Sequence, residues 1–508
     1  MRETLLSYIH DLWNDGEATA LMARRGLRTL PWSYRQVTRK AFQVAEELSY
    51  RGLRKGDRVI LCAENSPEWV AVFFGCLLRG VIVVPLDAQS TLDFLSRVQH
   101  EIKAKCLLGG ESRRDFVESS LLVESLKRFC RIVATHPANP DWSYTNKIGS
   151  DHVVEIMFTS GTTGIPKGVC LTHQNFLANL IPLETEIQKY LKWEPIVRPI
   201  RFLNLLPLSH IFGQLMGIFV PPMLKGQVLF LNSLNPSDII GCIRRDRISV
   251  VATVPRILEI LRDKVDRDEA SRDRALLMKD SLDGNAQLHW LRRWWTFRKI
   301  RRQFGWKFWA FVSGGAALRV DTEDFWQKLG YVVVQGYGMT ETASIISVSH
   351  PFRSRRGSIG KTMPGQEIKL GEGGEILVRG RNVSPGYWKD DGLPLTDQEG
   401  WLSTGDLGVR DAQGNLFFQG RRNEVPARRP DSGSRSRHGR KRPFLMEHAD
   451  PDGVTLWRPG RRAPPKTPNQ CAPASRRMTS GTASRSLSRC RAPMRGWASR
   501  SPMRLRWR

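Results

Sequence analysis

Short apolar segments alternate with amphipathic helical segments along most of this chain, and that alternation restricts the fold more than any other feature of the sequence. Residues 33–48 have apolar side chains at helical spacing, and residues 57–63 follow as a short apolar run typical of a buried strand. Strands separated by helices in this order indicate a parallel sheet covered by helices. The sequence therefore predicts an α/β fold.

The alternation continues on both sides of a glycine-rich loop. It predicts strands at 81–86, 105–108, 153–158, 202–206, 227–231, 250–253, 309–313 and 332–335, and helices at 91–101, 174–180, 236–244 and 256–264. Residues 1–55 are expected to form a largely helical lead-in. The most apolar stretch, 69–86, is interrupted by Arg79 and Gly80. This interruption favours a buried helix, a turn and a buried strand over a membrane span.

Two later regions differ in composition and pattern from the alternating part of the chain. Residues 262–302 are dense in charge and Trp, and we expect a long helical insertion at the surface there. From about 357 to 420, short alternating segments such as Glu375-Ile-Leu-Val-Arg379 are separated by Gly and Asn turns. This pattern predicts a small β-rich subdomain appended to the α/β body.

Positive charge is concentrated in the last part of the chain. Of the formal net charge of +28, +17 lies in residues 425–508, which hold 19 Arg and 2 Lys against 4 acidic residues. This segment is rich in Arg, Pro and Ser and has no apolar period, so it cannot bury enough surface to offset the entropy of ordering. We predict a folded body at 1–424 and a disordered tail at 425–508. Such a tail would bind nucleic acid nonspecifically, but no motif predicts specific recognition.

The eight cysteines are scattered, without a CxxC pair or metal-ligand spacing. They predict reduced, mostly buried thiols in a cytoplasmic protein. The first residues, Met1-Arg-Glu-Thr-Leu-Leu-Ser-Tyr8, lack the apolar core of a signal peptide. The sequence contains no indication of an oligomeric state.

The strongest chemical signal is the loop Thr159-Ser-Gly-Thr-Thr-Gly-Ile-Pro-Lys-Gly168, which follows a predicted strand. Its glycines allow close backbone approach, its hydroxyls and amides can surround phosphate oxygens, and Lys167 supplies a cation. It is not a Walker loop, because Pro166-Lys167-Gly168 stands where Gly-Lys-Ser/Thr would be required. The sequence therefore predicts a nucleotide phosphate site of another kind.

This loop resembles the phosphate-binding signature of the acyl-adenylate-forming (AMP-binding) superfamily, which includes acyl-CoA synthetases. Four further segments resemble motifs of that family in its order. They are Gln335-Gly-Tyr-Gly-Met-Thr-Glu-Thr342, Gly374-Glu-Ile-Leu-Val-Arg-Gly380, Ser403-Thr-Gly-Asp406 and Gly420-Arg-Arg-Asn-Glu424. The resemblance implies a large adenylate-forming domain with two helix-flanked sheets and a β-rich subdomain. It also implies ATP, Mg²⁺ and coenzyme A as cofactor and co-substrates.

The resemblance assigns roles to individual residues. Thr340 would contact the α-phosphate, and Glu341 would hold Mg²⁺ together with Thr163. Tyr337 would stack on adenine, Asp406 would accept hydrogen bonds from the ribose hydroxyls, and Arg421 would add a donor beside the ribose. Taken alone, Glu341 could equally cap a helix and Asp406 could belong to a turn. The implied nucleotide-binding residues are Thr159, Ser160, Gly161, Thr162, Thr163, Gly164, Lys167, Gly314, Gly315, Ala316, Gln335, Gly336, Tyr337, Gly338, Thr340, Asp406 and Arg421. The implied catalytic residues are Lys167, His210, Thr340 and Glu341.

The acid substrate is indicated less directly. Pro207-Leu-Ser-His-Ile-Phe212 resembles the family segment whose His borders the acyl pocket, which makes His210 a candidate. Residues 291–305 resemble the insertion of long-chain fatty acyl-CoA synthetases, which favours a fatty acid. This basic, Trp-rich segment could lie on an anionic membrane or could be a solvated face with inward Trp side chains. An aryl- or amino-acid ligase and a non-catalytic nucleotide- or acyl-binding protein remain alternatives.

The end of the chain departs from the family pattern. The family has a second domain after the hinge that supplies a Lys for adenylation, and residues 425–508 contain none of its pattern. We interpret this segment as a product of a shifted reading frame, because codons for Val425-Pro-Ala-Arg-Arg429 read one base later can spell Cys-Leu-Pro-Asp-Gly. We therefore expect impaired activity.

Overall fold

The computed structural model describes residues 2–25, 28–110, 121–137, 140, 142–159, 167–193, 198–268, 297–389 and 395–424. Its longer helices are α1 (Leu6–Asn14), α2 (Tyr34–Tyr50), α3 (Pro67–Arg79), α4 (Leu92–Ile102), α5 (Leu126–Ile132), α6 (His173–Gln188), α10 (Pro236–Arg245), α11 (Pro255–Asp268), α14 (Arg298–Phe304) and α15 (Val320–Lys328). Two short helices, α8 (Ile211–Gln214) and α9 (Val220–Met223), flank a π-helical turn, η5 (Leu215–Phe219).

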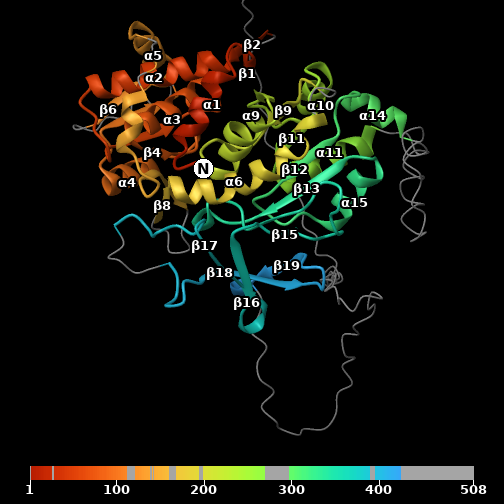
Figure 1. Ribbon diagram of the computed structural model, residues 1–508. Helices are drawn as coiled ribbons and strands as arrows, with labels where there is room; N and C mark the ends of the chain where they lie inside the picture. Colours follow the sequence, from red (N-terminus) through yellow and green to blue (C-terminus); the bar gives the residue numbers. More distant parts are fainter. Residues whose placement is uncertain are drawn as a thin grey trace, which may run out of the picture. The chain divides into compact units, whose positions relative to one another are not determined.

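Three sheets organise the described part of the chain (Figure 1). The first has the strand order β6-β5-β3-β4-β7-β8 and is parallel except for the antiparallel β7–β8 pair. Its strands are β3 (Arg58–Cys62), β4 (Ile82–Pro85), β5 (Cys106–Gly109), β6 (Leu122–Ser125), β7 (Val153–Thr159) and β8 (Lys167–Thr172).

The second sheet has nine strands in the order β15-β14-β13-β12-β11-β9-β10-β1-β2. The central strands from β13 to β1 are parallel, and β2, β14 and β15 are antiparallel to their neighbours. They are β1 (Thr19–Arg25), β2 (Arg28–Ser33), β9 (Arg201–Asn204), β10 (Gln227–Phe230), β11 (Val250–Thr253), β12 (Ala310–Ser313), β13 (Val332–Tyr337), β14 (Ser347–Val348) and β15 (Lys361–Thr362).

The third sheet is antiparallel, in the order β16-β17-β18-β19. It comprises β16 (Gln366–Leu370), β17 (Glu375–Gly380), β18 (Leu402–Arg410) and β19 (Leu416–Arg421), drawn in teal to blue in Figure 1. The strand predicted at 375–379 is thus confirmed as β17.

The predicted α/β fold is confirmed, and most predicted elements lie within a few residues of their observed bounds. The stretch at 69–86 forms the predicted buried helix, turn and strand as α3 and β4. Ser66 caps α3 through its side chain, Pro67 occupies the first turn, and Gly80 ends the helix in the left-handed region at φ 68°. No helix among the described residues is long and apolar enough to cross a membrane.

One prediction about the early chain is wrong. Residues 19–25 and 28–33, expected within a helical lead-in, instead form the strands β1 and β2, because β1 pairs with β10 some two hundred residues later. Residues 167–172 form a strand that the sequence did not predict, β8, which pairs with β7. The insertion predicted at 262–302 begins with the end of α11 and ends with α14, and its residues 269–296 lie outside the described part.

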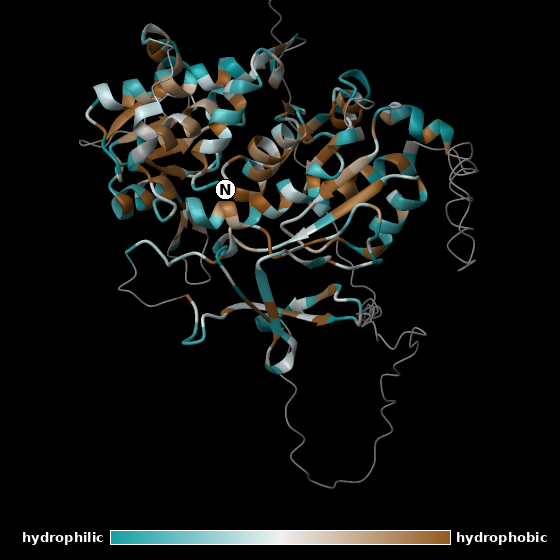
Figure 2. Cartoon of the chain, in the orientation of Figure 1, coloured by the Kyte–Doolittle hydropathy of each residue, from teal (hydrophilic) through white to brown (hydrophobic). Residues whose placement is uncertain are grey.

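The largest cluster of buried side chains contains residues of both large sheets together with α2, α3, α6 and η5. In Figure 2 these strands and the inner faces of these helices are brown, while the outer faces are largely teal. A second cluster lies on the other face of the nine-stranded sheet, where α10, α11, α14 and α15 cover β11, β12 and β13. The cores therefore cover both faces of the nine-stranded sheet.

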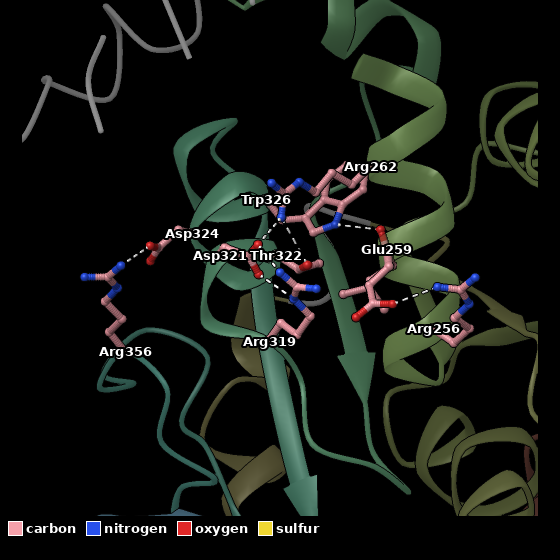
Figure 3. A network of polar contacts seen from close by, with 10 residues as sticks. Arg256, Glu259, Arg262, Arg319, Asp321, Thr322, Asp324, Trp326 and Arg356 are labelled. Atoms are coloured by element: carbon pink, nitrogen blue, oxygen red, sulfur yellow. Dashed lines mark hydrogen bonds and ion pairs between the residues drawn. The ribbon is translucent and has the colours of Figure 1, made fainter. Parts of the chain in front are cut away.

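Polar contacts join α11 to α15 (Figure 3). Arg262 donates to Thr322 at 3.3 Å and pairs with Asp321 at 3.1 Å, and buried Trp326 donates its indole N–H to the carbonyl of Leu258 at 3.3 Å. The exposed ion pairs contribute about 0.2–1 kcal/mol each. Trp326 is fully buried, and burial of such a side chain contributes about 3–5 kcal/mol, so it dominates this joint.

Candidate functional site

Two hydroxyl groups at the carboxyl edge of the nine-stranded sheet have no hydrogen-bond partner among the described residues. Thr253 ends β11 and Ser313 ends β12, and the two residues are register partners. Both hydroxyls are buried and accept or donate no hydrogen bond within the described part of the chain. Ligands of α/β proteins bind at this edge, so these groups mark a candidate site. Thr253 was missed from the sequence, where its only signal was its place at the end of an apolar strand.

The glycine-rich stretch after β12 is shaped by close packing. A Cβ at Gly314 would lie 2.9 Å from the ring of Phe212 and 3.2 Å from the carbonyl of Gly336, so a side chain does not fit there. Gly315 follows at φ 79° and, like Ala316, is exposed. Phe212 thereby brings the segment of His210, which is exposed and precedes α8, against the ends of β12 and β13.

The chain after β13 is tightly bent and strained. A Cβ at Gly338 would overlap the carbonyl oxygen of Ser344. Ala343 and Ser344 adopt φ angles of 49° and 85°, in the region that non-glycine residues rarely occupy. Such residues cost on the order of 1–3 kcal/mol each and gather at functional sites. Asn179 on α6 holds this bend, because its amide donates to the carbonyl of Ala343 at 2.7 Å.

The bend presents Thr340 and Glu341 on a 3-10 turn, η6 (Thr340–Thr342), where both are half-buried. The hydroxyl of Tyr387 donates to Glu341 Oε1 at 3.0 Å. The ammonium of Lys167 lies 5.1 Å from the ring centroid of the same Tyr387, a cation–π distance. The structure therefore brings the predicted Lys167 and Glu341 against one aromatic residue, Lys167 at its ring and Glu341 at its hydroxyl.

Tyr387 was not predicted, because nothing in its local sequence distinguishes it from a surface aromatic residue. It belongs to the segment that forms a β-bridge to Val169 on β8. Thr159 and Lys167 are register partners across β7 and β8, so the hairpin joins both ends of the predicted phosphate loop. Ser160, Gly161, Thr162, Thr163 and Gly164 lie outside the described residues.

Asp406 on β18 is buried and paired. The hydroxyl of Tyr337 donates to Asp406 Oδ2 at 2.9 Å, and the exposed Arg421 places Nε 3.6 Å from Oδ1. Burial raises the pKa of the Asp406 carboxyl and of the Tyr337 hydroxyl above their ordinary values. The two residues predicted to bind adenine and ribose thus contact each other directly.

Glu375 positions the turn that carries Asp406 and was also missed from the sequence. Its carboxylate accepts from the hydroxyl of Ser403, from the amide of Gly405 at 3.2 Å and from Arg422 at 2.9 Å. Three donors on one buried carboxylate fix the backbone before Asp406. The sequence signal was its place in the Gly374–Gly380 segment, interpreted there only as a strand.

A metal can be tested only against the donors in this part of the chain. Within the described ranges, no group of three or more His, Cys, Asp or Glu side chains could hold a metal ion. Mg²⁺ ordinarily takes one or two carboxylates, substrate phosphates and several waters. A single carboxylate such as Glu341 fits that pattern.

The comparisons with known proteins agree with this geometry. A model of the family described as AMP-binding enzyme matches residues 14–388. The chain belongs to this family, as its motifs predicted.

The chain is 27% identical over 411 residues to the long-chain-fatty-acid–CoA ligase FadD15 of Mycobacterium tuberculosis, covering 74% of this chain and 66% of that protein. It is 28% identical to the 2-succinylbenzoate–CoA ligase of Bacillus licheniformis, with 77% and 74% covered. The chain thus spans slightly less than two thirds of the length of the first relative.

Solved structures of this fold superpose on the chain. ATP-bound MatB from Rhodopseudomonas palustris matches with a TM-score of 0.66 at 25% identity, covering 84% of this chain and 80% of that one. The N-terminal domain of FACL13 from Mycobacterium tuberculosis matches with a TM-score of 0.64 at 21% identity, covering 83% of this chain and all, 100%, of that domain. The second match shows the shared fold alone.

Proposed function

We propose that this chain descends from an ATP-dependent acid–thiol ligase and that its site activates a carboxylic acid. A carboxylate oxygen would attack the α-phosphorus of ATP, the bond to the β-phosphate oxygen would break, and pyrophosphate would leave. The thiol sulfur of coenzyme A would then attack the acyl carbon and release AMP. The observation that carries the proposal is that Lys167 and Glu341 both contact Tyr387. Glu341 also lies on the turn that follows Tyr337, whose hydroxyl donates to Asp406.

Each of these residues would contribute through its charge or its hydrogen-bonding groups. Lys167 offsets the negative charge of the phosphates, and Thr340 donates to the α-phosphate. Mg²⁺, when bound through Glu341 and Thr163, would neutralise phosphate charge and polarise the phosphoryl oxygens. Asp406 binds the ribose hydroxyls, Arg421 adds a donor, and the remaining glycine positions let the nucleotide approach the backbone.

The acid is proposed to be a long-chain fatty acid, with His210 and the 314–316 stretch bordering its channel. Similarity to FadD15 supports this choice, while similarity to ligases named for succinylbenzoate, and to 4-coumarate–CoA ligase 3 of Arabidopsis thaliana, supports an aryl acid. A membrane contact through 291–305 stays a prediction, because those residues lie mostly outside the described part. A cytoplasmic location agrees with the six described cysteines, none of which forms a disulfide.

A panel of acids in an ATP–pyrophosphate exchange assay tests this function. We expect palmitate and oleate to support exchange at least tenfold better than coumarate or succinylbenzoate. Exchange with the aryl acids alone would replace the fatty acid by the alternative. If no acid supports exchange while AMP still binds, the chain is a nucleotide-binding protein only.

Asp406→Ala is expected to weaken AMP binding by about 10- to 100-fold, because hydrogen bonds to a charged group contribute about 1.5–3 kcal/mol each. Titration calorimetry with AMP measures this directly. Tyr337→Phe keeps the ring and removes only the hydroxyl that donates to Asp406. Its effect should be less than about fivefold. An Asp406→Ala variant that binds AMP like the parent chain would contradict the ribose assignment.

A further inference from the structure

One carboxyl group lies in the interior of β7, the strand that leads into the phosphate loop. Glu155 has 0% of its surface exposed. Its register partners, Val83 on β4 and Leu171 on β8, are apolar and buried. Met157, two residues along the same face, belongs to the core cluster that spans both large sheets. An ionised carboxylate in such surroundings is costly, so its partners decide which form it takes.

The partner of Glu155 is Gln214, the last residue of α8, which is also fully buried. The amide nitrogen of Gln214 donates to Glu155 Oε2 at 2.8 Å and to the carbonyl of Leu208 at 3.0 Å, so both of its hydrogens are used. The other oxygen of each side chain, Oε1 of Glu155 and Oε1 of Gln214, is buried and has no hydrogen-bond partner among the described residues.

The two unpartnered oxygens belong to the same acid–amide pair. If Glu155 were ionised, both would be buried acceptors without a donor, and an unpaired buried acceptor destabilises the folded chain. A neutral carboxylic acid has an O–H group, and donation of that one proton satisfies both oxygens at once. Acid and amide are complementary in this way only when the acid is neutral.

We propose that Glu155 is held as the neutral acid, that it donates its proton to Gln214 Oε1, and that this acid–amide pair fixes the His210 segment against the phosphate-loop strand. Glu155 is a positioning residue, because it acts through Gln214 and the Leu208 carbonyl. Gln214 also donates its backbone N–H to the carbonyl of His210 at 3.1 Å. The expected effect on binding of the acid substrate rests on the proposed function, whereas the protonation state of Glu155 does not.

The surroundings favour the neutral form. Burial raises the pKa of the Glu155 carboxyl to about 8, although the hydrogen bond from Gln214 lowers it. β4 and η5 contribute no titratable side chain. The titratable groups on the other elements packed nearby are Lys167 and Cys170 on β8, His173, Glu184 and Glu186 on α6, and His210 before α8. Cys170 pairs with Ile156 and so faces the other side of the sheet, and the ring of His173 accepts from the amide of Leu5.

The pH dependence of stability tests the protonation state without any activity assay. Glu155→Gln carries an amide in place of the neutral acid. The folded pKa of about 8 is raised above the reference value of 4.5, so between these values the unfolded chain binds fewer protons than the folded chain. The folding equilibrium of the parent chain should therefore fall roughly tenfold per pH unit relative to E155Q from about pH 5 to 8. Urea unfolding of the full chain at several pH values measures this difference.

A control is Glu184→Gln. Glu184 is half-buried, it pairs with Arg2 and accepts from the hydroxyl of Tyr8, and its pKa is lowered. Neither partner changes charge between about pH 5 and 8, and the contribution of Glu184 is lost only as pH falls through the lowered value, so the difference between E184Q and the parent should be flat in that range. If the difference between E155Q and the parent is equally flat, Glu155 is ionised in the folded chain and the proposal is overturned.

Hydrogen–deuterium exchange tests the positioning role. Glu155→Leu removes both hydrogen bonds, and exchange of the 208–214 amides should become at least tenfold faster, while E155Q should retain parental rates. If E155L does not fold, Gln214→Leu removes the same pair from the other side and should give the same result. Unchanged exchange in these Leu variants would overturn the positioning role. Where pyrophosphate exchange is active, E155L should raise the KM for the acid more than that for ATP. Absence of exchange activity in every form would count against the proposed function alone.

Discussion

Glu341→Gln is expected to lower ATP–pyrophosphate exchange by about 100-fold or more while leaving the fold intact. The substitution keeps the shape of the side chain and removes the only charge on η6. Loss of one group that stabilises developing charge in the transition state typically costs about 10²–10³ in rate. The measurement is the exchange rate over a range of Mg²⁺ concentrations, because a lost metal ligand should also raise the Mg²⁺ concentration needed for half-maximal rate.

Tyr387→Phe is the control for this experiment. It removes the hydroxyl that donates to Glu341 and keeps the ring beside Lys167. A loss of about tenfold or less is expected, since orientation is impaired while the carboxylate charge remains. Parental exchange by E341Q at every Mg²⁺ concentration would show that Glu341 takes no part in the reaction.

Gly338→Ala is expected to destabilise the chain by about 3 kcal/mol or more, a large effect for one methyl group. Its Cβ would overlap the backbone carbonyl of Ser344, which cannot rotate away as a side chain could. Ser344 and its neighbour Ala343 already have positive φ angles, so the bend has little freedom to relax. Urea unfolding at a single pH measures the change.

The matched control is Gly241→Ala on α10. Nothing lies within 4 Å of a Cβ at this position, and the helix should gain about 0.5–1 kcal/mol from the substitution. If G338A and G241A unfold at the same urea concentration, the bend is not rigid. In that case the strain at Ala343 and Ser344 has no structural importance.

The sequence predicted the parts of the fold that depend on local pattern. The stretch at 69–86 shows this well. Ser66 and Pro67 begin α3 and Gly80 ends it, and all three act through capping chemistry that is local. Residues 19–33 could not be assigned in the same way. Their strand conformation depends on β10, and no short-range periodicity can indicate a partner two hundred residues away.

The candidate site shows the same division. Motifs predicted Lys167, Glu341, Tyr337 and Asp406. In the structure, Lys167 and Glu341 both contact Tyr387, and Tyr337 contacts Asp406. Residues that act through three-dimensional contact were missed. Tyr387 reaches Glu341 from a segment more than forty residues later, and Glu375 accepts its hydrogen bonds across the β17–β18 pair. Such supporting residues have no spacing rule, because only the tertiary fold determines their distance from the site.

The pairing of β1 with β10 has a consequence for synthesis on the ribosome. Ala23 cannot meet its partner Phe230 until both have left the exit tunnel. At a synthesis rate of about 5–20 residues per second, β1 stays without its partner β10 for roughly 10–40 s. During that interval the β1–β2 hairpin offers unpaired backbone groups to any other extended chain nearby. Chaperone binding early in translation would therefore protect the yield of this protein most at its amino-terminal hairpin.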